Sequence, residues 1–374
     1  MSRPRTYLDW NATAPLRREA RAAMVAALDV AGNPSSPHAE GRRARGLVED
    51  AREQVAALVG AGPAEVVFTS GGTEANNAVL AAGWDAILLS GIEHDSVLAP
   101  ARGSGAQVID IPVGCDGVVR GEHFSGAKTQ WRRALVSLQM ANNETGALQP
   151  VAATAAWAKE HSLFMHSDAV QAAGRVPIDM HALGVDYLTL SAHKLGGPKG
   201  VGALVIRDGA SLPAFVTGGG QERRRRAGTE NVAAIAGFGA AAAAARRDLA
   251  EIDKVRALRD RLEAEVREIA PEAVVIAEEA DRLPNTSSLG LPGASAETLV
   301  IALDLEGVAV SAGAACSSGK VGASHVLAAM GLAPDIARAA IRISLGPAST
   351  ERDIAAFLAA WHRIAATRRR RAVA

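Results

Sequence analysis

The stretch from about Glu65 to Ile206 alternates short apolar runs rich in β-branched residues with longer stretches typical of helices. Strands that alternate with helices predict right-handed crossovers and a mostly parallel sheet with helices on both faces. In sheets of this kind, ligands bind beyond the carboxyl ends of the strands. Helices are expected over 73–82 and 151–161, and strands over 66–70, 86–90, 107–112, 134–139, 163–167, 187–190 and 202–206.

A smaller α+β unit is expected after the Ala-rich run 232–245, because the density of charged residues rises from Arg246 to Arg267. In that part, strands are expected near 285–291 and 341–345, followed by a helix from Ser349 to about Ala366 and a solvated run of arginines, Arg368–Arg371. We therefore expect a large domain at 16–248 and a small C-terminal domain at 249–374, with residues 1–15 packed against the small domain.

The charge balance and the cysteine count exclude several classes of function. Forty Lys and Arg offset forty Asp and Glu, and aromatic residues make up only 3% of the chain, so we expect no nucleic-acid partner. Two cysteines, Cys115 and Cys316, are too few for a disulfide framework or a four-thiolate zinc site. The longest run without a charged or polar side chain, 232–245, is too short to span a bilayer. No apolar signal core follows the charged N-terminal residues, so no export signal is expected. These features predict a soluble, cytoplasmic protein without a membrane partner or a metal site.

Two of the expected strands end in residues suited to binding a cofactor. After the strand 66–70, Gly71 and Gly72 precede Thr73 at the start of a helix, where backbone N–H groups and the helix dipole favour a phosphate. The alternative is a tight turn with an ordinary N-cap. Lys194 leaves the strand 187–190 among small residues, where desolvation would make it an imine-forming nucleophile; the alternative is a solvated lysine.

Three further strand ends add polar side chains. Asp168 ends an apolar strand, where its carboxylate either caps a helix or meets a cation such as a pyridinium nitrogen. Gln171 completes a capping box or contacts a polar group. Asn143 lies in a turn-like Asn-Asn pair, and the imidazole of His94 is either structural or stacked on a planar ring. Together these groups are what pyridoxal phosphate (PLP) requires of a protein.

With these motifs in hand, the sequence resembles the cysteine desulfurases, within the class V aminotransferase family of fold-type I PLP enzymes. The lysine region marks the superfamily, and Cys316 among small residues marks the desulfurases. The resemblance implies a large domain built on a mostly parallel seven-stranded sheet covered by helices, plus a smaller C-terminal α+β domain. It covers nearly the whole chain, with matching motifs at 7–15, 32–38, 69–77, 142–146, 191–194, 218–222, 226–231 and 311–319.

The resemblance also implies how the chain holds the cofactor. Lys194 would bind PLP as an imine, Asp168 would pair with the ring nitrogen, His94 would stack on the ring, and Gln171 would face the phenolic oxygen. Thr229 would reach the phosphate in a neighbouring subunit, which implies a homodimer. Besides Thr229, the residues that would hold the phosphate are Thr73, Ser191 and His193, together with the Gly72 backbone.

The implied substrate is L-cysteine. Asn143 would lie beside cofactor and substrate, and Arg342 would grip the substrate carboxylate, as a guanidinium fork does well. Lys194 and His94 would act in catalysis, and the Cys316 thiolate would take the sulfur as a persulfide, leaving L-alanine. The sulfur would pass to an acceptor protein such as an iron–sulfur scaffold.

Other interpretations make different demands on these residues. The alternative enzyme is another class V PLP enzyme, such as a selenocysteine lyase or an aminotransferase, and an aminotransferase would not need Cys316. A non-catalytic assembly subunit is disfavoured, because Lys194, Asp168 and His94 are all present. Cys115 has no matching role in the resemblance.

Overall fold

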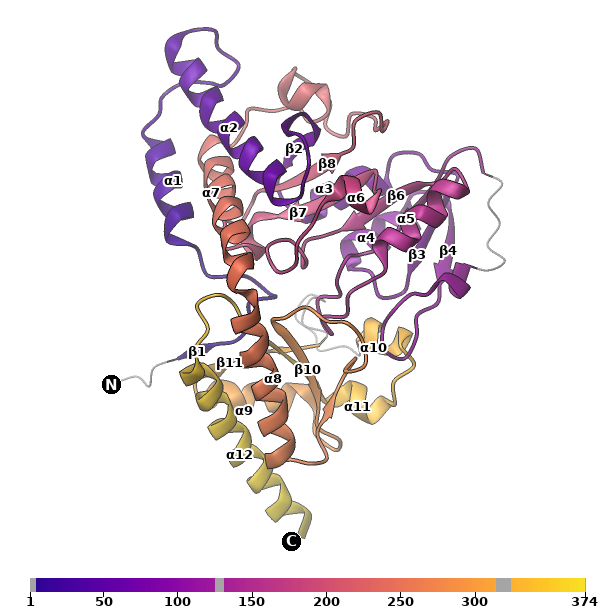
Figure 1. Ribbon diagram of the computed structural model, residues 1–374, viewed down its shortest axis with the longest axis vertical. Helices are drawn as coiled ribbons and strands as arrows, with labels where there is room; N and C mark the ends of the chain where they lie inside the picture. The colour runs from indigo at the N-terminus through magenta and orange to yellow at the C-terminus, as the bar shows by residue number, and fades with distance from the viewer. Residues whose placement is uncertain (1–4, 125–130, 314–323, 374) are drawn as a thin grey trace.

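The computed structural model describes residues 5–124, 131–313 and 324–373, and its largest element is a seven-stranded sheet (Figure 1). The strands lie in the order β2-β8-β7-β6-β5-β3-β4, and neighbours are parallel except that β8 runs against both β2 and β7. The mostly parallel sheet predicted from the sequence is thus confirmed. Its strands are β2 (Val66–Thr69), β3 (Ala86–Ser90), β4 (Gln107–Ile111), β5 (Ala134–Ser137), β6 (Phe164–Asp168), β7 (Tyr187–Ser191) and β8 (Gly202–Ile206).

Helices cover both faces of this sheet because alternate strand residues point to opposite sides. Leu88 on β3 packs in the core formed with α2, α5 and α7, whereas its neighbours Ile87 and Leu89 pack in the core formed with α3 and α4. Helix α1 packs on α7 at the edge of the first layer. These helices are α1 (Arg18–Leu28), α2 (Ala39–Leu58), α3 (Gly72–Leu80), α4 (Asp95–Gly103), α5 (Val151–Glu160), α6 (Met180–Leu183) and α7 (Val232–Asp248).

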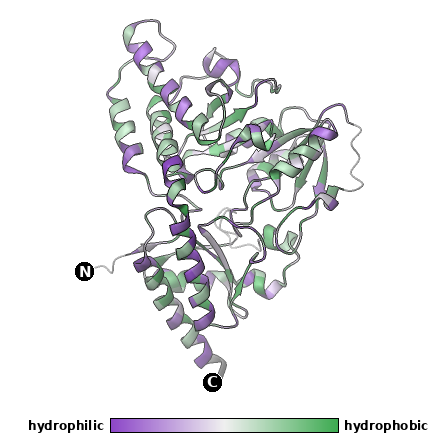
Figure 2. Cartoon of the chain, in the orientation of Figure 1, coloured by the Kyte–Doolittle hydropathy of each residue, from purple (hydrophilic) through white to green (hydrophobic). Residues whose placement is uncertain are grey.

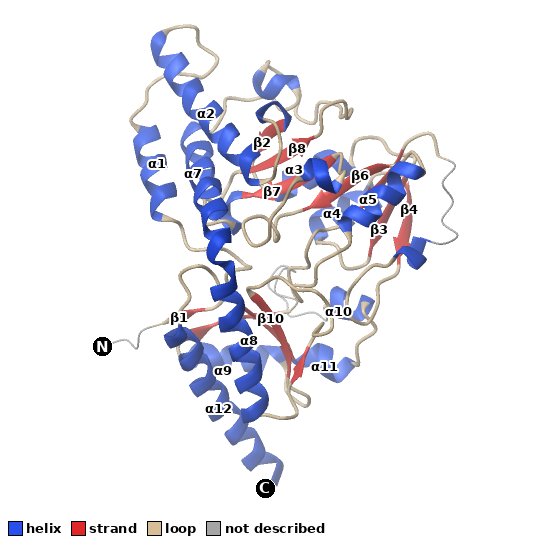
Figure 3. Cartoon of the chain, viewed as in Figure 1, coloured by secondary structure: helices blue, strands red, loops and turns tan. Residues whose placement is uncertain are grey.

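The C-terminal part has its own antiparallel sheet and its own core (Figure 3). The sheet order is β12-β13-β10-β9, and β1 (Thr6–Tyr7) pairs separately with β11 (Val308–Ala309), which brings Leu8 into this core. We propose that the two domains divide between residues 248 and 249, where α7 ends. The elements are α8 (Ile252–Ile269), β9 (Val274–Val275), β10 (Thr286–Gly290), α9 (Ala296–Leu305), β12 (Ser311–Ala312), α10 (His325–Ala329), α11 (Pro334–Ala339), β13 (Ala340–Ser344) and α12 (Glu351–Val373).

The last helix differs from the prediction. It continues past Ala366 to Val373, because the arginines expected to be a solvated run are partly engaged with the protein. Arg368 donates to the carbonyl oxygen of Pro292, and Arg369 donates to that of Ile269. Cations near a helix C-terminus also interact favourably with the helix dipole.

Apolar residues line the cores of both sheets, along the strands and on the inner faces of the helices (Figure 2). The largest fully buried side chain is Trp361 on α12, which stacks on Phe357 one turn earlier. Within the described ranges, none of the helices has both the length and the apolar character that a membrane span requires.

A buried ion pair joins α2 to the segment after the seven-stranded sheet. Arg52 binds both carboxylate oxygens of Glu222 at 2.8 and 2.9 Å, and one of these oxygens also accepts the backbone N–H of Phe68. The side chains of Arg52 and Glu222 are only 4% and 3% exposed. Glu222 adopts a left-handed backbone with φ of 42°, so this pair holds a strained turn in place.

We expect the Glu222→Ala substitution to lower the free energy of unfolding by about 3–5 kcal/mol, because it leaves the Arg52 guanidinium buried without its main partner. Urea denaturation measures this loss. The matched control is Glu49→Ala, which removes the other carboxylate near Arg52; Glu49 is 47% exposed, and its loss is expected to cost below about 1 kcal/mol. Equal losses in the two variants would contradict the prediction.

Candidate active site

A cavity of about 220 Å³ lies at the carboxyl edge of the seven-stranded sheet. Strands β2, β3, β5, β6 and β7 all end toward this edge, so the residues that follow them meet there although they are far apart in sequence. The structure brings together in this cavity all the predicted cofactor-binding residues except Thr229. These are Gly72, Thr73, His94, Asn143, Asp168, Gln171, Ser191, His193 and Lys194.

Asp168 is fixed at the end of β6 by two hydrogen bonds. Its Oδ2 accepts from Asn76 Nδ2 at 2.7 Å, and its Oδ1 accepts from the backbone N–H of Val170 at 2.9 Å. The Asp168 carboxylate therefore accepts a backbone N–H two residues along the chain, as a capping carboxylate does, and it also lines the cavity. Asn76 was not predicted as a site residue; it lies one turn into α3 and within the motif 69–77, which was the available signal.

Asn76 also contacts Ser96 at the start of α4. Its Nδ2 donates to Ser96 Oγ at 2.9 Å, whereas its buried Oδ1 has no partner among the described residues. The His94 Nδ1 lies 2.8 Å from the same hydroxyl and accepts the backbone N–H of Ser96. In the neutral imidazole this arrangement places the proton on Nε2. The contacts of Nδ1 with Ser96 therefore set the orientation of the His94 ring.

Lys194 follows β7 and lines the same cavity. Its Nζ donates to the backbone oxygens of Asn11 and, at 2.9 Å, of Ala12. The preceding residue, His193, contacts Thr13 Oγ1 at 3.2 Å. Burial and the nearby cations, Lys194 first among them, lower the pKa of His193 to about 4, so its imidazole is neutral at pH 7.

The start of α3 forms a compact seat beside the end of β7. A Cβ at Gly72 would lie 2.9 Å from Cγ2 of Val170, so no side chain fits between the helix start and the turn after β6. The N–H groups at this helix start are unsatisfied within the helix and favour an anion. With Thr73 and Ser191 at the same cavity, this is a suitable seat for a phosphate.

The residues present fit PLP. A carboxylate for the ring nitrogen, a lysine for the aldehyde and a helix N-terminus for the phosphate surround a single cavity. The unpartnered buried Oδ1 of Asn76, beside Asp168, is consistent with a polar environment that is completed by a bound group. The chemistry of the donor set therefore matches the cofactor that the sequence predicts.

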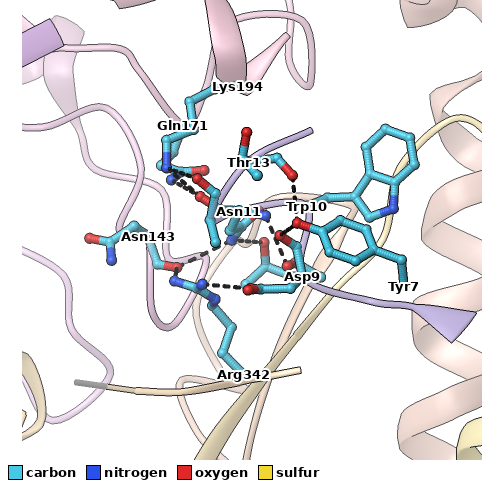
Figure 4. Close-up of polar contacts among 12 residues, drawn as sticks. Tyr7, Asp9, Trp10, Asn11, Thr13, Asn143, Gln171, Lys194 and Arg342 are labelled. Carbon is cyan, nitrogen blue, oxygen red and sulfur yellow. Dashed lines mark hydrogen bonds and ion pairs between the residues drawn. The ribbon is translucent and has the colours of Figure 1, made fainter. Parts of the chain in front are cut away.

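Arg342, on β13, is 1% exposed and reaches the site from the small sheet (Figure 4). Its Nη2 forms an ion pair with Asp9 Oδ1 at 2.9 Å, and its Nη1 donates to the backbone oxygen of Asn143 at 3.0 Å. Its Nε is buried without a partner among the described residues. The sequence interpretation missed Asp9, whose only signal was its place in the motif 7–15.

Asn11 was also missed, although it is fully buried and links both sheets (Figure 4). Its backbone oxygen accepts from Lys194 Nζ and from Gln171 Nε2. Its own N–H donates to Ser344 Oγ, and its Nδ2 donates to Thr286 Oγ1, both at 2.9 Å. The N-terminal segment therefore crosses the centre of the site and fixes the position of the lysine relative to the small sheet.

Thr229 is not among the residues that line this cavity. Thr229 lines a separate hollow of about 270 Å³ together with Ser70 and Glu230. Cys316 lies outside the described residues, which resume at Ser324. Ser324 Oγ donates to the buried carboxylate of Glu144 at 2.6 Å, so the described chain resumes beside the turn that carries Asn143.

A buried histidine behind the cavity makes the stability dependent on pH. His166 on β6 is fully buried, with its Nδ1 2.8 Å from Ser137 Oγ and its Nε2 3.1 Å from Thr189 Oγ1. Burial lowers its pKa to about 4. In the unfolded chain the pKa is about 6.5. Between these values the unfolded chain binds a proton that the native state does not, so stability falls as the pH falls.

We expect His166 to contribute a slope of about 1.4 kcal/mol per pH unit between about pH 6.5 and pH 4. His193, with its pKa also lowered to about 4, contributes in the same direction. A His166→Gln variant should therefore show a flatter pH dependence than the parent, even where its stability at pH 7 is lower. Urea unfolding across this range tests the expectation, and parallel curves for parent and variant would contradict it.

This chain is similar to proteins of a known family. The class-V aminotransferase family matches residues 6–357. The cysteine desulfurase IscS of Dictyoglomus turgidum is 40% identical over 360 residues, which cover 93% of this chain and 91% of that protein. A cysteine desulfurase of Cereibacter sphaeroides is 43% identical over 362 residues, covering 94% and 93%. The structure of a NifS-like protein from Rickettsia africae superposes with a TM-score of 0.90 at 37% identity, covering 96% of this chain and 99% of that one.

Proposed function

This chain belongs to the class-V aminotransferase family and, within it, to the cysteine desulfurases, and on that premise we propose that Lys194, Asp168 and His94 form its catalytic centre. Such enzymes depend on PLP and remove the sulfur of L-cysteine, giving L-alanine and an enzyme-bound persulfide. The observation that carries the proposal is the single cavity in which Lys194 and Asp168 meet the start of α3.

When bound, PLP supplies an electron-withdrawing ring that takes up the charge left when the Cα–H bond of the amino acid breaks. Asp168 would keep the ring nitrogen protonated, and its orientation is set by Asn76 and the Val170 N–H. His94 would stack on the ring, and Asn143 would lie beside cofactor and substrate. The remaining contacts would come from Gly72, Thr73, Gln171, Ser191 and His193.

Lys194 would also move the proton. Its Nζ is placed by two backbone oxygens, those of Asn11 and Ala12, and as a free amine it is the base that accepts the Cα proton. Because carbonyl oxygens are acceptors, they hold the lysine nitrogen at one position without consuming its lone pair when it is neutral.

Arg342 would bind the substrate carboxylate. Asp9 and the Asn143 carbonyl hold the guanidinium plane, while the unpartnered Nε–H remains as a donor. A charged hydrogen bond from a pre-oriented guanidinium is stronger than one from a mobile side chain. Asp9 thus supports Arg342 without itself being a ligand of the substrate.

The Cys316 thiolate would attack the sulfur of the substrate. A sulfur–sulfur bond forms as the Cβ–sulfur bond breaks, and the electron pair of the broken bond stays with the carbon side. A proton added at Cβ and the return of a proton from Lys194 to Cα then give alanine. The persulfide would then pass its outer sulfur to an acceptor protein such as an iron–sulfur scaffold. We further propose a homodimer in which Thr229 reaches the phosphate in the neighbouring subunit.

Trapping the persulfide tests this function directly. The PLP-loaded protein is incubated with L-cysteine, alkylated and digested, and the modified peptide is located by mass spectrometry. We expect one additional sulfur on Cys316 and none on Cys115. A persulfide confined to Cys115, or alanine formed without any persulfide, would overturn the assignment.

A further inference from the structure

A buried arginine without a carboxylate partner lies behind the cavity. Arg175 is 8% exposed, and among the described residues it makes no ion pair. Its Nη1 donates to the Gln171 backbone oxygen at 3.0 Å and to Gln171 Oε1, and its Nη2 donates to the Trp10 backbone oxygen at 3.4 Å. Burying an unpaired charge is costly, and an apolar side chain would fill the same space at lower cost.

The contact with Arg175 decides which way the Gln171 amide faces. A guanidinium carries only donors, so the Gln171 atom that it meets must be the oxygen. The amide nitrogen is thereby turned to the other side, where Nε2 donates to the Asn11 backbone oxygen at 3.0 Å. Lys194 Nζ donates to that same oxygen, so the Gln171 NH₂ group is directed to the place where the lysine nitrogen ends (Figure 4).

We propose that Arg175 is a positioning residue that holds the Gln171 amide with its NH₂ group toward the phenolic oxygen of PLP. This inference rests on the proposed function, in which Lys194 carries the cofactor as an imine. Hydrogen-bond donation stabilises the phenolate, and most of all when the neighbouring imine nitrogen has lost its proton. With the amide reversed, Oε1 would face the phenolate and repel it. Arg175 therefore lowers the pKa of the imine nitrogen.

Other charged groups around Lys194 come from separate elements and stay unchanged in the test. Asp168 ends β6, Arg342 lies on β13, and Lys199 and the neutral His193 follow β7. Because Arg175 is itself a cation, its charge and its contact with Gln171 must be separated. The Arg175→Lys variant does this, since lysine keeps the charge but has no planar fork to fix the amide.

The experiment follows the visible absorption of the PLP-loaded protein against pH, which reports the imine pKa without any turnover. We expect Arg175→Met and Gln171→Leu each to raise this pKa by about one unit, and the double variant to raise it no further than Gln171→Leu alone. Arg175→Lys should raise it by a smaller amount. The matched control is Arg259→Met, which removes another buried arginine. Arg259 does not line the cavity and donates to the Leu283 backbone oxygen, so its loss should leave the imine pKa unchanged.

Two results would overturn the inference: an unchanged pKa in Arg175→Lys, or shifts in Arg175→Met and Gln171→Leu that add fully in the double variant. Either one would mean that Arg175 acts through its charge alone. Where Arg175→Met does not fold, Arg175→Lys decides by itself. Failure of the parent protein to form a PLP absorption band would instead refute the proposed function, and so the two failures are distinguishable.

Discussion

A Lys194→Ala variant is expected to lose desulfurase activity by at least about 10³-fold, because one side chain would both attach the cofactor and accept the Cα proton. No other lysine lines the cavity among the residues that the structure describes. The fold should be unaffected, since the Lys194 side chain contacts backbone oxygens that water can satisfy.

The measurement combines activity with covalent trapping. Borohydride reduction of the loaded protein should fix the cofactor to the parent chain and leave Lys194→Ala unlabelled. Lys199→Ala is the matched control, because Lys199 is an exposed lysine five positions along the same turn, and it should be labelled like the parent. Cofactor fixed to any other lysine in the parent protein would show that the attachment site is misassigned.

The Cys316→Ala variant is expected to lose persulfide formation altogether and sulfur release by about 10³-fold, because the thiolate that receives the sulfur is gone. Unlike Lys194→Ala, it should keep its cofactor absorption and still bind L-cysteine, since the residues that line the cavity are intact. The two variants therefore separate loss of the cofactor chemistry from loss of the sulfur acceptor.

Cys115→Ala provides the control for the second prediction. Cys115 is an exposed, free cysteine in the turn after β4, and its removal should leave the rate of sulfur release within about twofold of the parent. Sulfide release at the parental rate by Cys316→Ala would contradict the mechanism and favour a PLP enzyme that does not pass sulfur through its own thiol.

The strands of the large sheet were predictable because their sequence pattern is local. Runs such as Ala86–Ser90 and Gly202–Ile206 are buried on both faces, so they are mostly apolar and are bounded by turn residues. Their observed limits match the prediction. The end of α12 was not predictable in the same way. Its last turns depend on contacts of Arg368 and Arg369 with carbonyl oxygens at Pro292 and Ile269, which no local pattern encodes.

The sequence alone determined which residue types follow the strands, because the end of a strand is set by the local sequence. The parallel topology then brings these strand ends together at one edge of the sheet. Lys194, Asp168 and His94 were found in this way. Only the tertiary structure decided what orients them: Asn11 meets Lys194 across 183 positions, Asn76 meets Asp168 across 92, and Asp9 meets Arg342 across 333. Such pairs depend on where whole elements pack and on the direction of individual hydrogen bonds, and neither is written in the spacing of residues along the chain.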